Sequence, residues 1–294
     1  MSALQKLAVF VVGFAVAFYF YSTSDKFEPE MLNGKRVIVT GASSGIGEQM
    51  AYHLAQMKSH VFITARREER LKQVVAKCLE LGAASAHYVA GSMDDMAFAE
   101  HVVAEAWKTF GGLDMLILNH IGNTSFGYFD GNVDHIRKLM EINFLSYATM
   151  TVAALPMLKE SGGNIVVVSS LAGKVPTPFT AAYSATKFAL DGFFGTLRHE
   201  LILQNFNVSV TLCVISFIDT DTAVRVVSKV IRQPPAPKQE CALEIIKGGI
   251  LRKREVYYAY EATKIPLLIR DWAPEYLDSL IRMNYNIENI KNPE

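Results

Sequence analysis

The sequence is poor in the features that mark disulfide-rich, nucleic-acid-binding and metal-binding proteins. It has only three cysteines (Cys78, Cys213 and Cys241), which lie far apart and therefore form neither a disulfide framework nor a CxxC metal site. It has no excess of either charge, with 29 basic and 29 acidic residues and no basic stripe, which argues against nucleic acid as a partner. Its seven histidines lack the ligand spacing of zinc sites, so we expect no metal.

The composition otherwise suits one large domain preceded by a membrane segment. Half of the 294 residues are hydrophobic, which is enough for the core of such a domain. Residues 7–21 carry no charge and end in an aromatic cluster typical of a membrane interface. This run is shorter than the roughly 20 residues that a full span prefers, which leaves a cleaved signal peptide as an alternative. The bulky residues 18–21 stand where a cleavage site needs small ones and favour an uncleaved signal anchor, a single transmembrane helix.

The charges beside the anchor predict its orientation. Lys6 and the free amine precede it, whereas acidic residues outnumber basic ones in the linker, residues 22–32. By the positive-inside rule, residues 1–6 form a short cytosolic tail and the body of the protein is luminal. Asn123 and Asn207 each begin a glycosylation sequon and are expected to carry glycans there. Membrane lipid around the anchor is accordingly an expected partner.

Apolar runs alternate with helical patterns through residues 33–260, the expected catalytic domain. The runs are short, apolar on both faces, and separated by helical stretches such as residues 68–81. This alternation predicts a parallel sheet covered by helices on both sides, which is a single doubly wound α/β domain of the Rossmann type. The expected strands are residues 37–40, 60–66, 86–92, 113–120, 163–170 and 207–215.

Residues 261–294 are expected to form a C-terminal helical tail. Between residues 266 and 290, apolar side chains recur at helical spacing. Two interpretations stay open: the apolar face packs in the core or against a second copy, or it rests on a bilayer near the substrate entrance. The side chains concerned are Leu267, Leu268, Ile269, Trp272, Leu277, Leu280 and Ile281.

A glycine-rich turn follows the first expected strand. Gly41, Gly45 and Gly47 form a TGxxxGxG pattern between a strand and a helix. Glycines in this position let the backbone turn tightly and approach a pyrophosphate, which binds at the helix N-terminus. A purely structural turn is the alternative. The strand–turn–helix context favours a dinucleotide site.

The end of the second expected strand indicates which dinucleotide binds. NAD-selective sites usually carry an acidic residue about 20 positions after the turn, where it holds the ribose 2′-hydroxyl. Arg66 and Arg67 stand at that strand end instead, and no carboxylate occurs there before Glu68. Because a guanidinium pairs well with a 2′-phosphate, NADPH and NADP+ are the expected cofactors. The alternative is that both arginines only solvate the start of a helix.

The pattern YxxxK occurs twice, as Tyr183–Lys187 and as Tyr260–Lys264. In each pair the two side chains are expected one helical turn apart on the same face. Ser170 ends the fifth expected strand shortly before Tyr183, and reactive groups gather at such strand ends. No such strand precedes Tyr260, so the first pair is the expected catalytic one. The Lys187 ammonium is expected to lower the pKa of the Tyr183 hydroxyl toward the range useful for acid–base chemistry.

Together these motifs resemble the short-chain dehydrogenase/reductase family over roughly residues 33–250. The glycine turn, Ser170 and the Tyr183–Lys187 pair occur in that family's order and spacing, and Asn143 matches the fourth member of its catalytic set. The resemblance implies that Tyr183 exchanges a proton with the substrate while Ser170 binds the substrate's carbonyl oxygen. It also implies that Lys187 binds the nicotinamide ribose and that Asn143 holds a water in a proton relay.

The resemblance implies a full set of cofactor contacts, although the sequence departs from the family pattern in three places. His120 and Ile121 interrupt the usual NNAG motif, Ile215-Ser216 replaces a Pro-Gly pair, and Ser44 stands where many NADP-binding members have lysine. The expected contacts are Gly41, Ala42, Ser43, Ser44, Gly45, Ile46, Gly47, Arg66, Arg67, Ser92, Met93, Asn119, His120, Ile121, Tyr183, Lys187, Ile218, Asp219, Thr220 and Thr222.

A closer resemblance, to steroid-reducing members of the family, extends through the anchor and the tail. Residues 79–88 and 240–249 are among the stretches that carry it. It implies reduction of an 11-keto steroid to the 11β-alcohol, reversible with NADP+, by a homodimer in the membrane of the endoplasmic reticulum. One alternative is a broader luminal carbonyl reductase of oxysterols, retinoids or xenobiotic ketones. Another is an NADP-binding scaffold without turnover, against which the intact set Ser170, Tyr183 and Lys187 argues.

Overall fold

The computed structural model describes residues 11–13, 26–124 and 126–290. Apart from residues 11–13, the expected cytosolic tail and anchor lie outside the described residues, so both stay predictions. Within the described ranges, no helix has both the length and the apolar character that crossing a membrane requires.

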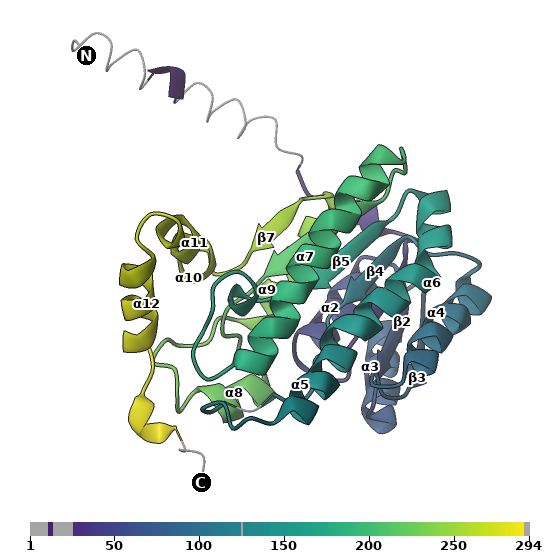
Figure 1. Ribbon diagram of the computed structural model, residues 1–294. Helices are drawn as coiled ribbons and strands as arrows, with labels where there is room; N and C mark the ends of the chain where they lie inside the picture. Colours follow the sequence, from purple (N-terminus) through teal and green to yellow (C-terminus); the bar gives the residue numbers. More distant parts are fainter. Residues whose placement is uncertain (1–10, 14–25, 125, 291–294) are drawn as a thin grey trace.

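Seven parallel strands form a single sheet (Figure 1). In chain order they are β1 (Arg36–Thr40), β2 (His60–Ala65), β3 (Ser85–Ala90), β4 (Met115–Leu118), β5 (Asn164–Val168), β6 (Ser209–Val214) and β7 (Glu255–Tyr257). Their order in space is β3-β2-β1-β4-β5-β6-β7, so the sheet grows in opposite directions from the β1–β4 pair. Ligands of such sheets bind outside the carboxyl ends of the strands at this switch point. The prediction of a doubly wound parallel sheet is confirmed.

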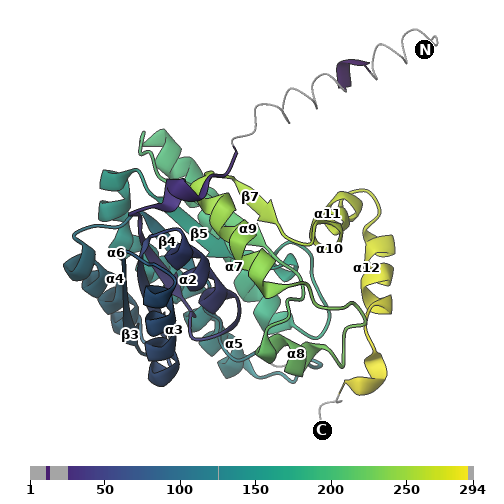
Figure 2. The same cartoon turned by 180° about the vertical axis from the view of Figure 1, so that it is seen from behind.

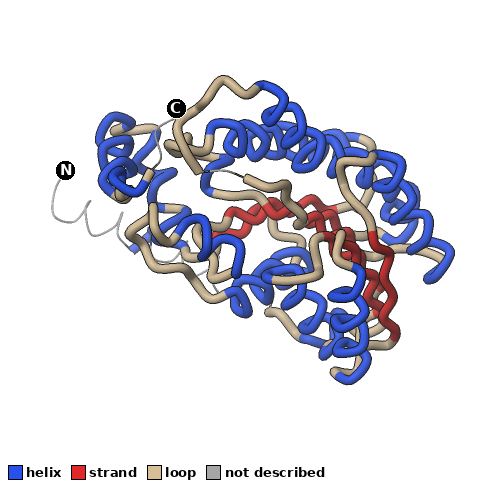
Figure 3. The backbone as a smooth tube through the Cα atoms, turned by 90° about the horizontal axis from the view of Figure 1, so that it is seen from below, coloured by secondary structure: helices blue, strands red, loops and turns tan. Residues whose placement is uncertain are grey.

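Helices cover both faces of the sheet, as the front and back views show (Figures 1 and 2). Alternate residues of a strand face opposite layers: Val37 and Val39 pack into one core and Ile38 into the other. One layer holds α2 (Gly45–Gln56), α3 (Glu68–Glu80) and α9 (Lys238–Ile250), and the other holds α4 (Met96–Phe110), α6 (Ser146–Ser161) and α7 (Ala181–Leu203). Seen from below, the strands run between these two layers (Figure 3). This burial on both faces explains why the strands are apolar throughout.

Shorter elements complete the body, and one of them was not expected from the sequence. The edge strand β7 is only three residues long, and it forms by pairing with β6, where Leu212 lies beside Glu255. So short a run carries no apolar periodicity, which is why the sequence predicted six strands. The remaining elements include α5 (Val133–Met140), a π-helical segment (Glu141–Leu145), a 3-10 turn (Leu171–Gly173) and α8 (Asp221–Val227).

The described part of the C-terminal tail contains three short α-helices and a 3-10 helix (Ile287–Asn289), and its apolar side chains lie in two environments. The α-helices are α10 (Tyr260–Thr263), α11 (Ile265–Arg270) and α12 (Pro274–Met283). Leu277 and Tyr285 are buried, and Tyr285 packs against Phe126 and Phe179 of the body. Trp272, by contrast, is 90% exposed. Packing against the body therefore accounts for part of the tail. The exposed apolar side chains are still compatible with the second interpretation, contact with a bilayer.

Candidate active site

A cavity of about 610 Å³ opens at the carboxyl ends of the strands, at the switch point between β1 and β4. It brings together most of the side chains that the sequence singled out. Ala42, Gly47, Asp219 and Asn143 do not line it. Those that do are Gly41, Ser43, Ser44, Gly45, Ile46, Arg66, Arg67, Ser92, Met93, Asn119, His120, Ile121, Ser170, Tyr183, Lys187, Ile218, Thr220 and Thr222.

The glycine-rich turn between β1 and α2 has the shape of an anion cradle. Gly41 and Gly45 have φ angles of 66° and 62°, a region that side chains disfavour. A Cβ on Gly47 would lie 2.4 Å from the Gly41 carbonyl oxygen, so the turn closes only without one. Gly47 thus packs beneath the turn instead of lining the cavity, and Ala42 is fully buried beside it. The N-terminus of α2 therefore faces the cavity with its backbone exposed to a ligand.

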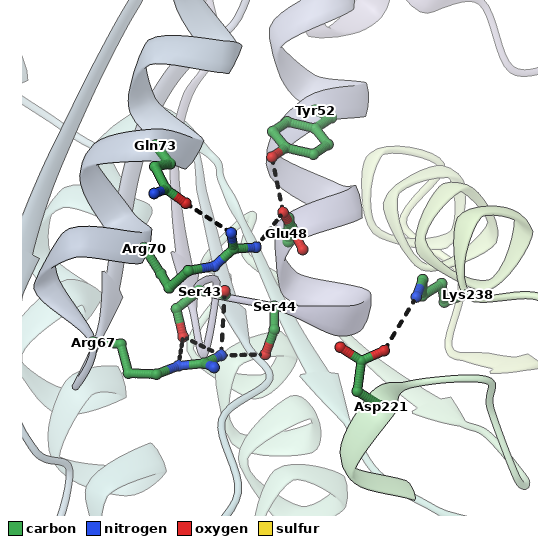
Figure 4. Close-up of polar contacts among 9 residues, drawn as sticks. All are labelled: Ser43, Ser44, Glu48, Tyr52, Arg67, Arg70, Gln73, Asp221 and Lys238. Atoms are coloured by element: carbon green, nitrogen blue, oxygen red, sulfur yellow. Dashed lines mark hydrogen bonds and ion pairs between the residues drawn. The ribbon is translucent and has the colours of Figure 1, made fainter. Parts of the chain in front are cut away.

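Arg67 lies across this turn (Figure 4). Its guanidinium Nη2 donates to the Ser44 Oγ at 2.6 Å and to the Ser43 Oγ at 3.1 Å. Arg66 lines the same end of the cavity. Arg70 is occupied elsewhere, since it pairs with Glu48 at 3.3 Å (Figure 4). Two guanidinium groups are thus placed beside the turn, where the sequence predicted the 2′-phosphate.

Asn119 and His120 join the ends of β1 and β4 at the switch point. The Asn119 side chain donates to the Thr40 carbonyl oxygen at 3.0 Å. His120 Nε2 lies 2.7 Å from the Ser146 hydroxyl and 3.0 Å from the Ile142 carbonyl oxygen, and its Nδ1 lies 2.8 Å from the Thr40 hydroxyl. Burial lowers the pKa of His120 to about 3. His120, which departs from the family's NNAG motif, is therefore an uncharged side chain that links the end of β1 to the π-helical segment.

Asn143 sits in the π-helical segment, a local irregularity often found at functional sites. It is fully buried, and its Oδ1 accepts from the Gly122 amide at 2.7 Å. Its Nδ2 donates to the Thr186 hydroxyl at 3.2 Å, and that hydroxyl donates to the Tyr183 carbonyl oxygen at 2.7 Å. Asn143 thus connects the loop after β4 to the helix of Tyr183. Its role in holding a water stays a prediction.

Asp219 is likewise used outside the cavity. Its carboxylate accepts from the Lys238 amide at 2.6 Å, at the start of α9. Thr220 next to it caps α8 by accepting from the Ala223 amide at 3.3 Å. Asp219 and Thr220 therefore fix the end of the loop after β6 and the start of α8, where Thr220 and Thr222 line the cavity.

Ser170, Tyr183 and Lys187 all line the cavity. Ser170 follows β5 and caps the 3-10 turn, because its Oγ accepts from the Ala172 amide at 3.2 Å. Tyr183 stands in the first turn of α7, with Lys187 one turn further on. The Lys187 Nζ lies 5.6 Å from the centre of the Tyr183 ring and donates to the Val168 carbonyl oxygen at 2.8 Å.

The protonation of this group differs from the expectation drawn from the sequence. Burial raises the pKa of the Tyr183 hydroxyl, and a hydrogen bond with Ser170 opposes that rise only in part. Burial also lowers the pKa of the Lys187 ammonium to about 7. The expected lowering of the tyrosine pKa by lysine was therefore wrong for this structure, because removal from water disfavours the charged form of both groups. Tyr183 is neutral at physiological pH and holds a proton that it can donate.

Two further hydroxyls at the site were missed in the sequence. Thr64, in β2, and Ser169, after β5, both line the cavity. Their side-chain oxygens are buried and have no hydrogen-bond partner among the residues that the structure describes. Buried hydroxyls are normally paired, so both fit a ligand in the cavity. Their place at strand ends was the only sequence signal for them.

Part of the cavity wall is largely apolar. It is formed by the loops after β4 and β6, α8, the loop before α9 and the tail, which also contribute the polar Gln233 and Asn284. Its apolar lining consists of Phe126, Phe217, Ala223, Val226, Val227, Ile231, Ile281 and Tyr285. A water-insoluble substrate suits such walls.

The second YxxxK pair lies elsewhere. Tyr260 is 59% exposed at the start of α10, and the Lys264 Nζ lies 4.1 Å from the ring centre of Tyr257. Neither residue lines the cavity of Ser170 and Tyr183. The structure thus agrees with the choice of the first pair.

Comparison with known proteins agrees with this geometry. The chain matches the family described as short chain dehydrogenase over residues 35–230, more than half of its length. Hydroxysteroid 11-beta-dehydrogenase 1-like protein A of Xenopus laevis is 47% identical over 281 residues, which covers 95% of this chain and 96% of that protein. Hydroxysteroid 11-beta-dehydrogenase 1-like protein of Gallus gallus is 51% identical over 236 residues, which covers 80% and 82%.

Solved structures share the fold. A short chain dehydrogenase from Burkholderia cenocepacia J2315, in complex with NADP, has a TM-score of 0.68 at 29% identity and covers 77% of this chain and 97% of its own. A short chain dehydrogenase/reductase from Burkholderia phymatum, in complex with NAD, has a TM-score of 0.75 at 19% identity and covers 84% and 96%, a likeness of fold alone. With Ser170, Tyr183 and Lys187 in one cavity beside a glycine-rich turn, the chain belongs to the short-chain dehydrogenase family of oxidoreductases.

Proposed function

We propose that this oxidoreductase reduces an 11-keto steroid to the 11β-alcohol with NADPH, and runs in reverse with NADP+. The observation that carries the proposal is the single cavity in which Ser170, Tyr183 and Lys187 stand between a dinucleotide cradle and apolar walls. The names of the relatives in Xenopus laevis and Gallus gallus support the steroid.

The residues present fit the proposed cofactor. The glycine-rich turn, Arg66 and Arg67 line one cavity, and so do Thr64 and Ser169, whose hydroxyl oxygens have no hydrogen-bond partner among the described residues. NADPH, when bound, supplies the hydride for the carbonyl carbon. Ser170, Tyr183 and Lys187 line the same cavity as the residues that would hold this cofactor.

The side chains would handle the proton. The Ser170 hydroxyl donates a hydrogen bond to the carbonyl oxygen and stabilises the charge that grows there during reduction. Tyr183, which holds its proton at neutral pH, delivers it to that oxygen. Lys187, with a pKa of about 7, exchanges protons readily and stabilises the tyrosinate that is left.

The substrate is tested by turnover of the purified full chain. Rates would be compared for a panel of 11-keto steroids, 7-keto sterols, retinal and simple aryl ketones. A strong preference for the 11-keto steroids supports the proposal. A broad profile would favour the second candidate, a general carbonyl reductase, which the extended apolar walls of the cavity also accommodate.

Replacing both Arg66 and Arg67 by alanine is expected to weaken NADPH far more than NADH. A charge-assisted hydrogen bond contributes about 1.5–3 kcal/mol, so the loss of one from the 2′-phosphate lowers NADPH affinity roughly tenfold or more. Fluorescence titration with both cofactors measures the effect. Arg70→Ala is the matched control, because Arg70 is already paired with Glu48. Equal losses for the two cofactors would show that the arginines only support the fold.

We further propose an uncleaved anchor in the endoplasmic reticulum membrane with the body in the lumen. The charges around residues 7–21 support this orientation, and Asn123 and Asn207 are both exposed. Asn207 lies just before β6 and does not line the cavity, and Arg252 donates to its Oδ1 at 2.9 Å and to its backbone carbonyl oxygen at 3.0 Å. The Nδ2 atom, which would carry a glycan, has no hydrogen-bond partner among the residues that the structure describes.

Expression in microsomes is expected to give a glycoprotein. Endoglycosidase treatment should increase the gel mobility of the full chain, and Asn207→Gln should remove all or part of that shift. Asn123→Gln serves as the control for the second sequon. The topology would be contradicted if the body were unglycosylated and if protease added to sealed microsomes digested it.

The expected homodimer also stays a prediction. Apolar side chains on the outer faces of α6 and α7 support it, since Val152 is 65% exposed and Ile202 is 61% exposed. The two helices lie side by side on one face of the molecule (Figure 1).

A further inference from the structure

A cluster of charges lies close to the catalytic residues but outside the cavity. Lys174 follows the 3-10 turn that begins at Ser170, and only 13% of its side chain is exposed. Its Nζ lies 2.5 Å from the Asp191 carboxylate and 2.8 Å from the Glu255 carboxylate. Tyr257 donates a further hydrogen bond to Glu255 at 2.6 Å. One lysine thus bridges three parts of the fold: the turn after β5, helix α7 and strand β7.

Asp191 connects this cluster to the catalytic helix. It stands one helical turn after Lys187 on α7, two turns after Tyr183. An ion pair from Lys174 to Asp191 therefore ties the turn that carries Ser170 to the helix that carries its two partners. Partly buried ion pairs of this kind fix geometry more firmly than exposed ones, because water screens them less.

The backbone of the turn also rests directly on α7. A Cβ on Gly173 would lie 2.8 Å from the Lys187 carbonyl oxygen, so the absence of a side chain permits the contact. The amides of Leu171, Gly173 and Lys174 each donate a backbone hydrogen bond of 2.9 Å. The turn is therefore a small rigid unit, held against α7 by close packing at one residue and by the ion pair at the next.

The tail is attached to the same point. The Arg270 side chain of α11 donates to the Lys174 carbonyl oxygen at 2.7 Å. The backbone of Lys174 thus binds the tail, and its side chain forms ion pairs with α7 and β7. No other lysine among the described residues joins two carboxylates from different elements at these distances: Lys72, the comparable case, pairs with Glu68 and Glu69 of its own helix.

We propose that Lys174 is a positioning residue, which holds the turn carrying Ser170 at the correct place relative to Tyr183 and Lys187 through its ion pair with Asp191. The inference rests on the proposed role of Ser170 toward the carbonyl oxygen. Lys174 does not line the cavity, so we expect its effect on catalysis to come through the position of Ser170. Loss of its charge should therefore move Ser170 without emptying the cofactor site.

The first test uses amide hydrogen exchange on the full chain and needs no substrate. Lys174→Met keeps the length of the side chain and removes its charge. Exchange of the amides in residues 171–175 is expected to accelerate on the order of tenfold or more, because local opening of the turn becomes easier. Lys72→Met is the matched control, since it also removes a lysine paired with two carboxylates, and it should leave these amides unchanged.

The second test is a kinetic cycle with Ser170→Ala, run on whichever ketone the wild type reduces fastest. Lys174→Met is expected to lower kcat about tenfold with the KM for NADPH unchanged, and Lys174→Arg should restore most of the rate. In the Ser170→Ala background the same lysine substitution should have little further effect. A merely structural role predicts the opposite, an equal loss in both backgrounds.

Either of two results would overturn the proposal: unchanged exchange of residues 171–175 in folded Lys174→Met, or an equal kcat loss with and without Ser170. If Lys174→Met does not fold, Asp191→Asn goes through the same two tests, since it removes the ion pair to α7 but keeps the one to Glu255. A wild type that ignores 11-keto steroids but reduces other ketones would contradict the proposed function and leave this inference standing.

Discussion

Tyr183→Phe is expected to lower turnover by about 10²-fold or more while leaving the fold and NADPH binding nearly intact. The substitution removes one oxygen from a side chain whose hydroxyl supplies the proton in reduction. Burial raises the pKa of that hydroxyl, so the wild-type side chain is protonated at neutral pH, whereas phenylalanine has no proton to donate. Steady-state kinetics and NADPH fluorescence on the purified variant measure the two parts of the prediction.

Tyr260→Phe is the matched control, because it makes the same change in the other YxxxK pair. Tyr260 is exposed on α10 and does not line the cavity, so its variant should turn over at the wild-type rate. Equal loss of activity in both variants, or an active Tyr183→Phe, would show that the wrong pair was chosen. The comparison also separates chemistry from any general effect of losing a tyrosine hydroxyl.

The fold and the centre of the site were predictable because they depend on local pattern. The strands at residues 37–40 and 163–170 are apolar on both faces, since two helical layers bury them. Strand ends collect reactive groups in this architecture, so Ser170 could be placed before the structure was known. Tyr183 and Lys187 could be placed on the same face of a helix because residues four positions apart are one helical turn apart.

What could not be predicted depends on contacts between distant parts of the chain. Lys174 and Glu255 are separated by 81 positions, and nothing local to either marks the ion pair. The three-residue strand β7 forms because its backbone pairs with β6. The orphan hydroxyls of Thr64 and Ser169 stand out only once their neighbours are known.

The pKa of Lys187 is the clearest case of a property set by tertiary structure. The sequence pattern predicted an ammonium that acts on Tyr183. Its side chain is instead only 1% exposed, with a carbonyl oxygen of Val168 as hydrogen-bond partner and no carboxylate among its contacts in the described part of the chain. Burial without a counter-charge lowers the pKa of a lysine, here from 10.5 to about 7.

This pKa makes the stability of the protein depend on pH in a defined window. In the unfolded chain Lys187 stays protonated up to its ordinary pKa of 10.5, whereas in the folded protein it loses its proton from about pH 7 upward. Between these values the unfolded state binds more protons, so the free energy of unfolding rises with pH. The contribution is about 1.4 kcal/mol per pH unit, and on the order of 5 kcal/mol across the whole window.

Lys187→Met is expected to abolish this dependence, because methionine fills a similar volume without a titrating group. Urea denaturation of both proteins, in the same detergent and between about pH 7 and pH 9, gives the two free energies of unfolding. The value for the wild type minus the value for the variant should rise by roughly 2 to 3 kcal/mol over that range, and all other groups cancel in the difference. Parallel curves would mean that Lys187 keeps an ordinary pKa in the folded protein. In that case its ammonium would be charged beside Tyr183 throughout, and the proton exchange proposed for the pair would lose its basis.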